Sequence, residues 1–397
     1  MGNSKKHHSK PCRVLHIEES MARGGAESWL MSLLRKTDRR ILEMDFCALK
    51  GEKGDFASEI ESLGSKIIPC SIKPLRTFKK RLGNIIKAGR YDVVHSHVWS
   101  FNGLILKIAR RCGVPIRIAH SHTTRSLHPP SCYRTIYGWC MRCLTLKYAT
   151  HCVGCASQAM TPLFGANWRK SGKCRILYCS IDVDPFSHDR PYEINKSHFG
   201  LQSDAVVIGN VGNIRTPKNH TFFLDIAAEL LHLKPNAYFL IVGDGPLKEQ
   251  MKNKAKMLKI DDRVIFAGIR SDVPQLLLNV FDVFLFPSLQ EGMPLALIEA
   301  AAAGLPVVCS DTITSEATDV IPQLFTRLSL DLPAEKWAVA VNDALEKDRM
   351  DQKQAYHIVK NSHFSVEYSL RELTSIYGCD QKAVIRSNQS NGGDNIE

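Results

Sequence analysis

The chain has 397 residues, of which 44% are hydrophobic and 23% are charged. This composition indicates a globular protein, and the length favours two domains because one domain usually takes roughly 100–200 residues. No apolar run approaches the roughly 18 residues of a membrane span, and the polar start M-G-N-S-K-K-H-H-S-K has no hydrophobic stretch behind it. We therefore expect a cytoplasmic protein with no signal peptide and no transmembrane helix.

Charge is distributed unevenly along the chain. Residues 1–180 contain 31 Lys and Arg against 11 Asp and Glu, a net charge of +20, whereas residues 181–397 contain 21 against 29, a net charge of −8. The basic half predicts an anionic partner, such as nucleic acid, an acidic membrane surface or a phosphorylated substrate. Since no recognised nucleic-acid-binding motif accompanies the charge, we expect no nucleic acid partner.

The basic half includes an amphipathic segment, residues 73–87, with apolar side chains at helical spacing and lysine and arginine elsewhere. Such a segment fits a helix that lies on a membrane surface. It also fits an ordinary crossover helix with a solvated basic face, which is the interpretation that we favour.

Thirteen cysteines are many for a chain without an export signal, and we expect them to be reduced. Cys140 and Cys143, followed by Cys152 and Cys155, have the paired spacing of a zinc site. Only eight residues separate the pairs, against roughly 15–20 in a four-cysteine ribbon. We therefore predict buried structural thiols and no metal site.

Short apolar runs rich in β-branched residues alternate with amphipathic stretches from one end of the chain to the other. The expected strands of the first half are V-L-H-I (14–17), M-D-F-C-A-L (44–49), K-I-I-P (66–69), D-V-V-H (92–95), I-R-I-A-H (116–120) and H-C-V-G-C (151–155). Those of the second half are A-V-V-I-G-N-V (205–211), A-Y-F-L-I-V-G (237–243), R-V-I-F-A-G (263–268), V-F-L-F-P-S (283–288) and P-V-V-C-S (306–310). This alternation predicts the α/β class, with two Rossmann-like, doubly wound parallel-sheet domains.

The turn-rich stretch S-I-D-V-D-P-F-S-H-D-R-P-Y, which begins at residue 180, interrupts the alternation and marks the domain boundary. We expect an N-terminal basic domain at 11–180, a C-terminal domain at 181–365, a C-terminal helix at 366–379 that packs back onto the N-terminal domain, and disordered tails at 1–10 and 380–397. Ligands of open α/β sheets bind beyond the carboxyl ends of the strands. A cleft where the two domains face each other is the expected site.

The segment Q-E-G-M-P-L-A-L-I-E-A-A-A-A-G places two glutamates around a predicted helix that begins at Pro294 and stops at Gly304. Met293 precedes this helix where a capping side chain is usual, so the first backbone N–H groups remain available for an anion. Glu291 in the loop and Glu299 on the helix would flank that anion and accept hydroxyl hydrogen bonds, as a nucleotide sugar requires. Glu299 could also be solvent-exposed, but the apolar residues around it predict a buried helix.

Two further loops follow predicted strands. V-G-N-I-R-T-P-K-N-H places Lys218 at the same sheet edge, where it would supply the cation that a diphosphate needs. M-A-R-G-G-A-E-S-W places Gly24 and Gly25 at a helix start, where backbone can approach a ligand closely.

Histidines end two predicted strands as the pairs His95 and His97, and His120 and His122. Alternate residues on a strand point to the same side, so each pair could bind metal. We find no adjacent carboxylate or cysteine that completes a ligand set. We therefore expect structural, hydrogen-bonded histidines, with His122 the favoured polar contact to a substrate.

Together these motifs resemble the retaining glycosyltransferases of family 4, which have the GT-B architecture of two Rossmann-like domains facing a central cleft. The most specific match is the E-x7-E signature, here Glu291 and Glu299. G-G-A-E, A-H-S-H-T, V-G-D-G-P-L and V-I-F-A-G-I-R support it, and the match extends from R-V-L-H-I to about Tyr377. The segment C-S-D-T-I-T-S-E and the N-terminal half look most like the branch that builds capsular and exported polysaccharides.

The resemblance implies a role for each matching position. Glu299 would hold the donor ribose, and Glu291 would contact the donor sugar. The sugar and phosphates would be held by backbone at Gly292, Met293, Pro294 and Leu295, the diphosphate by Lys218, and the base by backbone near Ile269 and Arg270. Gly24 and Gly25 would line the phosphate and acceptor side, and His122 would lie near the reacting sugar. Glu291, His122 and Lys218 would thus be the catalytic residues. The reaction is expected to need no metal and no cofactor other than the nucleotide sugar, with the leaving diphosphate helping to deprotonate the acceptor hydroxyl.

One position departs from the family pattern. Asn213 follows V-G, where family members usually have an arginine, and Arg215 two residues later is the candidate replacement. Loss of one preorganised phosphate contact without replacement would cost about 2–4 kcal/mol of transition-state stabilisation.

The leading hypothesis is a glycosyltransferase on the cytoplasmic face of a membrane. It would move a sugar from a nucleotide-diphosphate sugar to a glycan or lipid-linked acceptor, with its basic half meeting the acceptor or an anionic membrane. A nucleotide-sugar epimerase of the same fold is one alternative. The other, motivated by Asn213, is a catalytically weak or silent nucleotide-sugar-binding protein.

Overall fold

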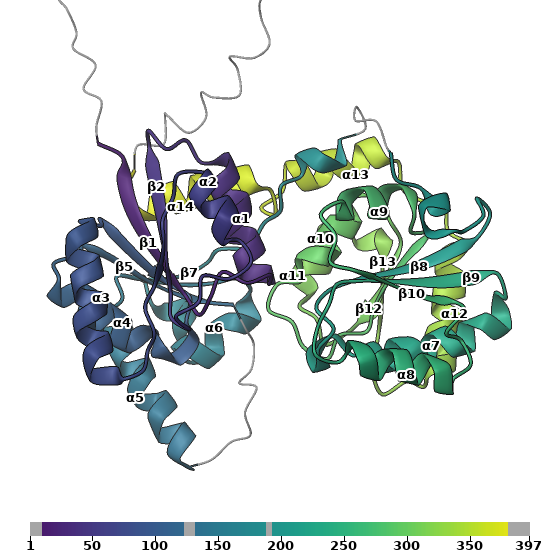
Figure 1. Cartoon of the computed structure of the whole chain (residues 1–397), viewed down its shortest axis with the longest axis horizontal. Coiled ribbons are helices and arrows are strands. Elements are labelled where there is room, and N and C mark those ends of the chain that lie inside the picture. The colour runs from purple at the N-terminus through teal and green to yellow at the C-terminus, as the bar shows by residue number, and fades with distance from the viewer. Residues whose placement is uncertain (1–9, 123–131, 188–192, 380–397) are drawn as a thin grey trace, which may run out of the picture. The chain divides into compact units, whose positions relative to one another are not determined.

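The computed structural model of the chain describes residues 10–122, 132–187 and 193–379. The chain divides into two compact units, shown in Figure 1. Unit 1 comprises residues 1–179 and 366–397, and unit 2 comprises residues 180–365. The two expected tails fall outside the described residues, apart from residue 10.

Unit 1 contains a sheet of seven parallel strands in the order β3-β2-β1-β4-β5-β6-β7. Its strands are β1 (Cys12–Glu18), β2 (Leu42–Ala48), β3 (Ile67–Pro69), β4 (Val93–Ser96), β5 (Ile116–Ser121), β6 (His151–Gly154) and β7 (Cys174–Ile176). Its helices are α1 (Gly25–Lys36), α2 (Ala57–Ser62), α3 (Leu75–Gly89), α4 (Asn102–Arg111), α5 (Cys132–Tyr148), α6 (Ser157–Phe164) and α14 (Val366–Ile376). The strand order reverses between β1 and β4, which makes that point the topological switch of the sheet.

Helices cover both faces of this sheet. Apolar side chains of α3, α4 and α6 join the strands in one buried cluster that includes Leu15, Phe78 and Ile105. On the other face, Trp29 of α1 and Tyr377, just after α14, pack against histidines of the strands. Figure 1 shows α14 (yellow) beside the N-terminal elements, and α14 contacts α1. The C-terminal helix therefore belongs to unit 1.

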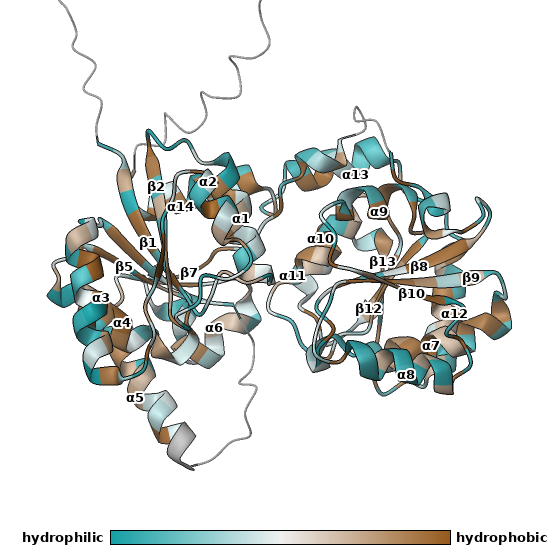
Figure 2. Cartoon of the chain, viewed as in Figure 1, coloured by the Kyte–Doolittle hydropathy of each residue, from teal (hydrophilic) through white to brown (hydrophobic). Residues whose placement is uncertain are grey.

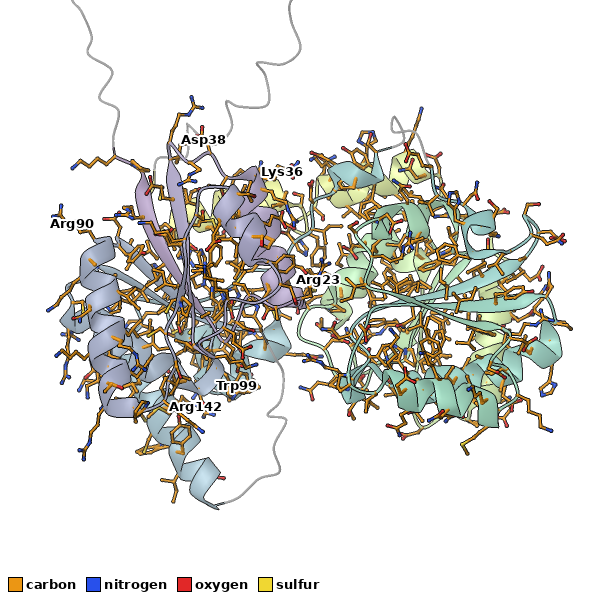
Figure 3. The ribbon with its side chains drawn as sticks, viewed as in Figure 1. Arg23, Lys36, Asp38, Arg90, Trp99 and Arg142 are labelled. Atoms are coloured by element: carbon orange, nitrogen blue, oxygen red, sulfur yellow. The ribbon has the colours of Figure 1, made fainter. Side chains whose placement is uncertain are left out.

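Helix α3 corresponds to the amphipathic segment of the sequence. Its apolar side chains Phe78, Leu82 and Ile86 are buried in the core of unit 1. The helix ends at Gly89, and its C-cap, Arg90, is an exposed residue in the left-handed conformation with φ 49° (Figure 3). Most of the apolar face therefore packs into the protein core, as expected of a crossover helix, while Leu75 at its start is 47% exposed.

Unit 2 contains a sheet of six parallel strands in the order β10-β9-β8-β11-β12-β13. Its strands are β8 (Val206–Val211), β9 (Ala237–Val242), β10 (Val264–Gly268), β11 (Val283–Phe286), β12 (Val307–Ser310) and β13 (Phe325–Leu328). Its helices are α7 (His220–Leu233), α8 (Lys248–Met257), α9 (Val273–Asn279), α10 (Leu295–Ala302), α11 (Ser315–Thr318), α12 (Ala334–Leu345) and α13 (Gln352–Lys360), with a 3₁₀ turn at Thr216–Lys218. The switch point lies between β8 and β11.

Two Rossmann-like parallel sheets were predicted, and this prediction is confirmed. Two strands were missed: β7 and β13, each at one edge of its sheet. Both are short and only partly buried, so they lack the apolar run that marks the central strands (Figure 2). Within the described ranges, no helix has both the length and the apolar character needed to cross a membrane.

Candidate functional site

The loops after β8 and β11 meet at the switch point of unit 2. Nζ of Lys218 lies 2.8 Å from Oε1 of Glu291, and the two side chains are only 21% and 12% exposed. The same ammonium group lies 4.7 Å from the ring centroid of Phe286, the last residue of β11. The structure therefore joins two predicted site residues from loops 73 residues apart in the sequence.

Backbone and amide hydrogen bonds hold these two loops together. The N–H of Leu289 donates to the carbonyl of Pro217 at 2.8 Å. The side-chain amide of Asn219 donates to the carbonyl of Pro287 at 3.1 Å. Lys218 lies between these anchors, so its position is fixed by groups other than its ion pair.

Helix α10 begins directly after the Glu291 loop. It runs from Leu295 to Ala302, with Pro294 as its N-cap rather than its first helical residue, so the predicted start was one residue early. Pro294 has φ −79° and ψ 95°, and no side chain caps the helix. Met293 is buried, while Gly292 and Leu295 are partly buried. The predicted uncapped helix start is confirmed, and its orphan N–H groups can bind an anion.

Glu299 lies in the interior of α10, among buried alanines and Ile298. Burial raises the pKa of its carboxyl group from 4.5 to about 7. Among the described residues, no side chain forms a hydrogen bond or ion pair with this carboxyl group. A partly buried carboxylate without a protein partner is costly, so an external hydroxyl donor would stabilise its ionised form.

Asn213 and Arg215 lie in the loop between β8 and the 3₁₀ turn. Arg215 is exposed, and the side chain of Ile214 between them is buried. Gly212 packs against Lys218, since a Cβ atom there would lie 3.1 Å from Cε of the lysine. The loop thus presents Arg215 to solvent and Lys218 to Glu291.

The predicted base-contacting positions follow β10 at the same edge of unit 2. Ile269 is 56% exposed, which is high for a large apolar side chain. The guanidinium of Arg270 forms an ion pair with Asp272, with Nε donating to Oδ1 at 2.8 Å. Arg270 is therefore held in place, and the apolar surface of Ile269 remains open to a ligand.

Gly24 and Gly25 lie at the start of α1 in unit 1. Gly24 is the N-cap, with φ −159° and ψ 171°, and no side chain caps the helix. A Cβ atom on Gly24 would collide with the Glu27 carboxylate at 2.3 Å, whereas one on Gly25 would meet open space. Both units therefore present an uncapped helix start, each following a strand that borders its switch point.

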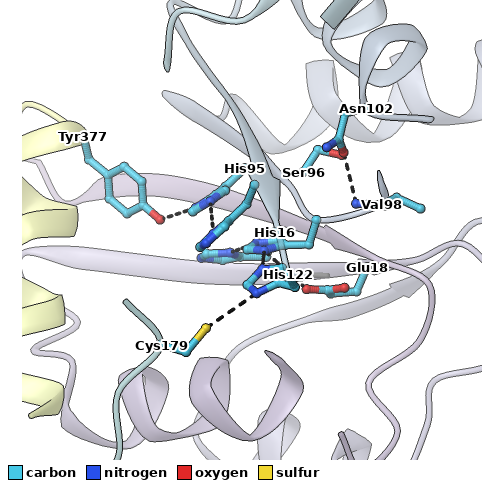
Figure 4. Close-up of polar contacts among 11 residues, drawn as sticks. His16, Glu18, His95, Ser96, Val98, Asn102, His122, Cys179 and Tyr377 are labelled. Atoms are coloured by element: carbon cyan, nitrogen blue, oxygen red, sulfur yellow. Dashed lines mark hydrogen bonds and ion pairs between the residues drawn. The ribbon is translucent and has the colours of Figure 1, made fainter. Parts of the chain in front are cut away.

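Five histidines gather on the face of the unit 1 sheet that Trp29 of α1 covers: His16, His95, His97, His120 and His122, of which Figure 4 labels the first, the second and the last. His16 of β1 is in register with His95 of β4, and residues two positions further along a strand point to the same side. The rings of His95 and His97 stack with centroids 4.2 Å apart, and those of His120 and His122 are 3.9 Å apart. Strand periodicity and register therefore produce the cluster.

Two chains of hydrogen bonds run through this cluster. In the first, Nδ1 of His95 lies 2.8 Å from the Tyr377 hydroxyl and Nε2 lies 3.1 Å from Nδ1 of His120. In the second, Nδ1 of His16 lies 3.1 Å from Nε2 of His97, whose Nδ1 lies 2.8 Å from Nε2 of His122.

Burial is the main cause that lowers the pKa of four imidazoles, those of His16, His95, His97 and His120. It lowers the pKa of His16 to about 3 and holds the pKa values of His95, His97 and His120 well below 6.5. These four rings are therefore neutral near pH 7.

The expectation that no carboxylate or cysteine accompanies the histidines was wrong. Oε1 of Glu18 lies 3.5 Å from Nδ1 of His97, and Sγ of Cys179 lies 3.5 Å from Nδ1 of His122. The prediction of buried thiols also fails for Cys140 and Cys143, which are exposed. Cys152 and Cys155 are buried as predicted.

The comparisons with known proteins agree with this geometry. The family profile described as "Glycosyl transferases group 1" matches residues 192–361, and the profile described as "Glycosyltransferase Family 4" matches residues 23–185. "Putative glycosyltransferase EpsF" of Bacillus subtilis (strain 168) is 32% identical over 378 residues, which cover 92% of this chain and 96% of EpsF. The chain belongs to glycosyltransferase family 4.

A second relative and a solved structure fit this assignment. "Capsular polysaccharide biosynthesis glycosyltransferase CapH" of Staphylococcus aureus is 26% identical to this glycosyltransferase over 372 residues, which cover 92% of this chain and 98% of CapH. HepE of Anabaena, solved in complex with UDP, superposes with a TM-score of 0.76 at 18% identity, covering 92% of this chain and 99% of HepE. The glycosyltransferase therefore has the GT-B architecture, and one of its relatives, CapH, is named for capsular polysaccharide biosynthesis.

Proposed function

We propose that this glycosyltransferase transfers a hexose from a nucleotide-diphosphate sugar to a glycan or lipid-linked acceptor, with retention of anomeric configuration. The observation that carries the proposal is the Lys218–Glu291 pair beside the uncapped start of α10. It places a cation, a carboxylate and free backbone N–H groups at one edge of one sheet. A sugar diphosphate needs all three.

Relatives support the class of donor and acceptor. HepE was solved with UDP and with UDP-glucose. A relative from Escherichia coli, 29% identical over 58% of this chain, is named "UDP-Gal:alpha-D-GlcNAc-diphosphoundecaprenol alpha-1,3-galactosyltransferase". We therefore propose a nucleoside-diphosphate hexose as donor and a diphospholipid-linked sugar as acceptor.

Donor binding would exchange the partners of Lys218. In the structure its ammonium group pairs with Glu291 at 2.8 Å. A diphosphate carries more negative charge than one carboxylate, so it would draw Lys218 toward the departing phosphate. Glu291 would then be released to accept a hydroxyl hydrogen bond from the donor sugar.

Glu299 would hold the donor ribose from its place on α10. Two ribose hydroxyl donors would compensate the ionised carboxylate, whose pKa burial raises to about 7. Backbone from Gly292 to Leu295 would contact the sugar and phosphates, and Ile269 with Arg270 would border the base. Asn213 occupies the position where family members usually have a phosphate-binding arginine. The exposed Arg215 is the proposed substitute for that arginine as the second cation on the phosphates.

The proposed chemistry uses no metal ion. Lys218 and the N–H groups at the start of α10 would stabilise the charge that develops on the leaving diphosphate. A phosphate oxygen would take the proton of the acceptor hydroxyl on the same face of the sugar. In unit 1, Gly24 and Gly25 would line the phosphate and acceptor side, and His122 would contact the reacting sugar.

The basic face of unit 1 is the proposed contact with an anionic membrane. A groove of about 300 Å³ between α3 and α4 is lined by Lys79, Lys80, Lys87, Lys107 and Arg111. Five cations around one groove attract anionic phospholipid headgroups, at about 1 kcal/mol for each residue near the surface. We propose that this groove holds the enzyme at the membrane that contains its acceptor.

A donor screen tests the proposed function. The purified protein is incubated with a panel of nucleotide sugars and a diphospholipid-linked sugar acceptor, and the anomeric configuration of the product is read by NMR. We expect turnover with one nucleoside-diphosphate hexose and a retained anomer, unaffected by a metal chelator. Inversion of the anomer, or conversion of the donor to its epimer without transfer, would contradict the proposal.

A further inference from the structure

Three potential metal ligands meet at the carboxyl edge of the unit 1 sheet. His122 follows β5, Cys155 follows β6 and Cys179 lies shortly after β7, and these three strands are neighbours. Nitrogen and sulfur ligand atoms of the three residues all lie within 4.8 Å of one another. We propose that His122, Cys155 and Cys179 bind a borderline-soft divalent cation of the Zn²⁺ class. The whole site lies in unit 1.

The spacing of the ligand atoms fits a tetrahedral ion. Sγ of Cys179 lies 3.5 Å from Nδ1 of His122. Zinc binds thiolate at about 2.3 Å and imidazole at about 2.0–2.1 Å, so two such ligands at a tetrahedral angle are about 3.5 Å apart. An ion can therefore sit between this sulfur and this nitrogen with little movement of either side chain.

Burial and charge also suit a thiolate site. Cys155 is 1% exposed and Cys179 is 3% exposed, while His122 is only partly buried. Two thiolates cancel the charge of a divalent ion, so the occupied site is neutral and its burial avoids the cost of an isolated charge. Three protein ligands leave a fourth position for water or an added ligand, an arrangement also found in zinc sites with two cysteines and one histidine.

The neighbouring histidines orient His122 for this role. Metal-binding imidazoles usually donate their second N–H group to a fixed partner. Here Nε2 of His122 lies 2.8 Å from Nδ1 of His97, and Nε2 of His97 lies 3.1 Å from Nδ1 of His16. The hydrogen-bond distances fit protons on Nε2 of all three rings as well as the reverse arrangement, and in the first case the lone pair on Nδ1 of His122 faces Cys179.

Backbone hydrogen bonds fix the two cysteines. The N–H of Cys155 donates to the carbonyl of Ser121 at 3.0 Å, and the N–H of Leu177 donates to the carbonyl of Gly154 at 3.0 Å. The hydroxyl of Ser369 donates to the carbonyl of Tyr178, next to Cys179. The ligands are therefore held by the sheet and by α14 before any ion binds.

Two other histidine triads in the cluster are weaker candidates. His16, His95 and His97 form one, and His97, His120 and His122 form the other. Both consist of imidazoles alone, and several of their ring nitrogens already bond to one another or to Tyr377, although Nε2 of His16 and Nε2 of His120 are buried without a hydrogen-bond partner among the described residues. Thiolates bind zinc more strongly than such engaged rings, which favours the site with two cysteines.

Cobalt substitution tests the site directly. The full-length protein is reduced with a phosphine, stripped of metal and titrated with Co²⁺ in the absence of donor. We expect one equivalent of Co²⁺ to bind tightly. The spectrum should show the intense visible bands of tetrahedral Co²⁺ and a thiolate-to-cobalt charge-transfer band, and added Zn²⁺ should remove both. Cys155→Ser and Cys179→Ser should each lose the charge-transfer intensity, and His97→Gln should weaken Zn²⁺ binding roughly 10- to 100-fold.

Cys152→Ser provides the matched control. Cys152 is a buried residue of β6, the strand that Cys155 follows. Its thiol contacts a second cysteine, Cys174, rather than a histidine. This variant should bind Co²⁺ like the wild type, and thermal unfolding should show that all variants are folded. Three outcomes would overturn the proposal. They are an octahedral Co²⁺ spectrum, the lack of tight Co²⁺ binding, and tight Co²⁺ binding that survives both Cys155→Ser and Cys179→Ser. Because the proposed transfer reaction needs no metal, such a failure would leave the proposed function standing. A bound ion would instead occupy Nδ1 of His122, whose Nε2 already bonds to His97, so the ion and the reacting sugar would be alternative partners of this histidine.

Discussion

Nζ of Lys218 and Oε1 of Glu291 lie 2.8 Å apart, so one ion pair joins the loop after β8 to the loop after β11. Lys218→Ala would remove the cation proposed to stabilise the leaving diphosphate. With one preorganised donor as the measure, kcat/KM should fall roughly 100- to 1,000-fold. Steady-state kinetics with the donor identified by the screen would measure this.

Lys254→Ala is the matched control for this variant. Lys254 forms a 2.7 Å ion pair with Asp225, and its side chain is 23% exposed, close to the 21% of Lys218. This pair joins α8 to α7, so its loss should leave kcat/KM within about twofold. Equal losses in the two lysine variants would mean that Lys218 acts through stability rather than through the donor.

Glu299→Ala should weaken donor use by removing the proposed ribose acceptor. A hydrogen bond to a charged group contributes about 1.5–3 kcal/mol, which corresponds to roughly a 10- to 150-fold loss in kcat/KM. Nucleoside-diphosphate affinity, measured by calorimetry, should fall in parallel because the lost contact is to the nucleotide. Unchanged nucleotide affinity would remove the ribose assignment.

Glu299→Gln should raise stability above neutral pH. The carboxyl group has a pKa of about 7 in the folded chain against 4.5 ordinarily, so the folded state retains the proton longer. The free energy of unfolding of the wild type therefore falls as pH rises from about 4.5 to about 7. The variant should be more stable by about 3 kcal/mol near pH 8 and equally stable near pH 4, as measured by urea unfolding.

Asn213→Arg tests the departure from the family pattern. The substitution restores a cation in the loop that also holds Lys218, so it should raise kcat/KM for the donor about tenfold or more, within the 2–4 kcal/mol that one such contact can contribute. Arg215→Ala should lower kcat/KM in the wild type and have less effect once Asn213→Arg is present. Additive effects would show that Arg215 does not replace the family arginine.

The buried histidines should make unit 1 sensitive to acid. Burial holds the pKa of His16 at about 3 and those of His95, His97 and His120 well below 6.5. The free energy of unfolding is highest above a pH of about 6.5 and decreases as the pH falls toward the lowered pKa values. The decrease occurs because the histidines of the unfolded chain bind protons at a higher pH than the buried ones do. Each ring contributes roughly 1.4 kcal/mol per pH unit in that window.

Tryptophan fluorescence can follow the acid transition of unit 1. Trp29 packs against His120 with ring centroids 5.3 Å apart, and Trp337 is the only tryptophan of unit 2. In a Trp337→Phe variant the tryptophan fluorescence therefore reports unfolding of unit 1 alone. The pH midpoint of this unfolding should be higher than the pH midpoint for unit 2, which hydrogen exchange can measure. Replacing His16 with Asn should make the transition less steep, and an unchanged slope would contradict the histidine explanation.

Sequence patterns predicted the two sheets because central parallel strands are buried on both faces and read as apolar runs. They did not reveal β7 and β13, whose edge positions remove that requirement. The E-x7-E segment and Lys218 could be identified as loop residues, but their 2.8 Å contact depends on the strand order. Prediction succeeded where a single segment carries the signal.

The histidine and cysteine cluster was missed for the same reason. His16 looked like one position in an apolar strand, and Cys179 lies 57 residues from His122. Their meeting depends on the register of β1, β4 and β5 and on the adjacency of β5, β6 and β7. Strand periodicity alone gave the shared face of each histidine pair, and only the fold brought the cysteines to it.

Tyr377 has a consequence for the order in which the protein folds. Its hydroxyl lies 2.8 Å from Nδ1 of His95, 282 residues earlier in the chain, and all of unit 2 lies between them. While the ribosome is still making unit 2, α14 does not yet exist, and part of the histidine face remains open to water. Unit 1 is therefore begun first and completed last, and His95 gains its Tyr377 partner only when the final helix docks.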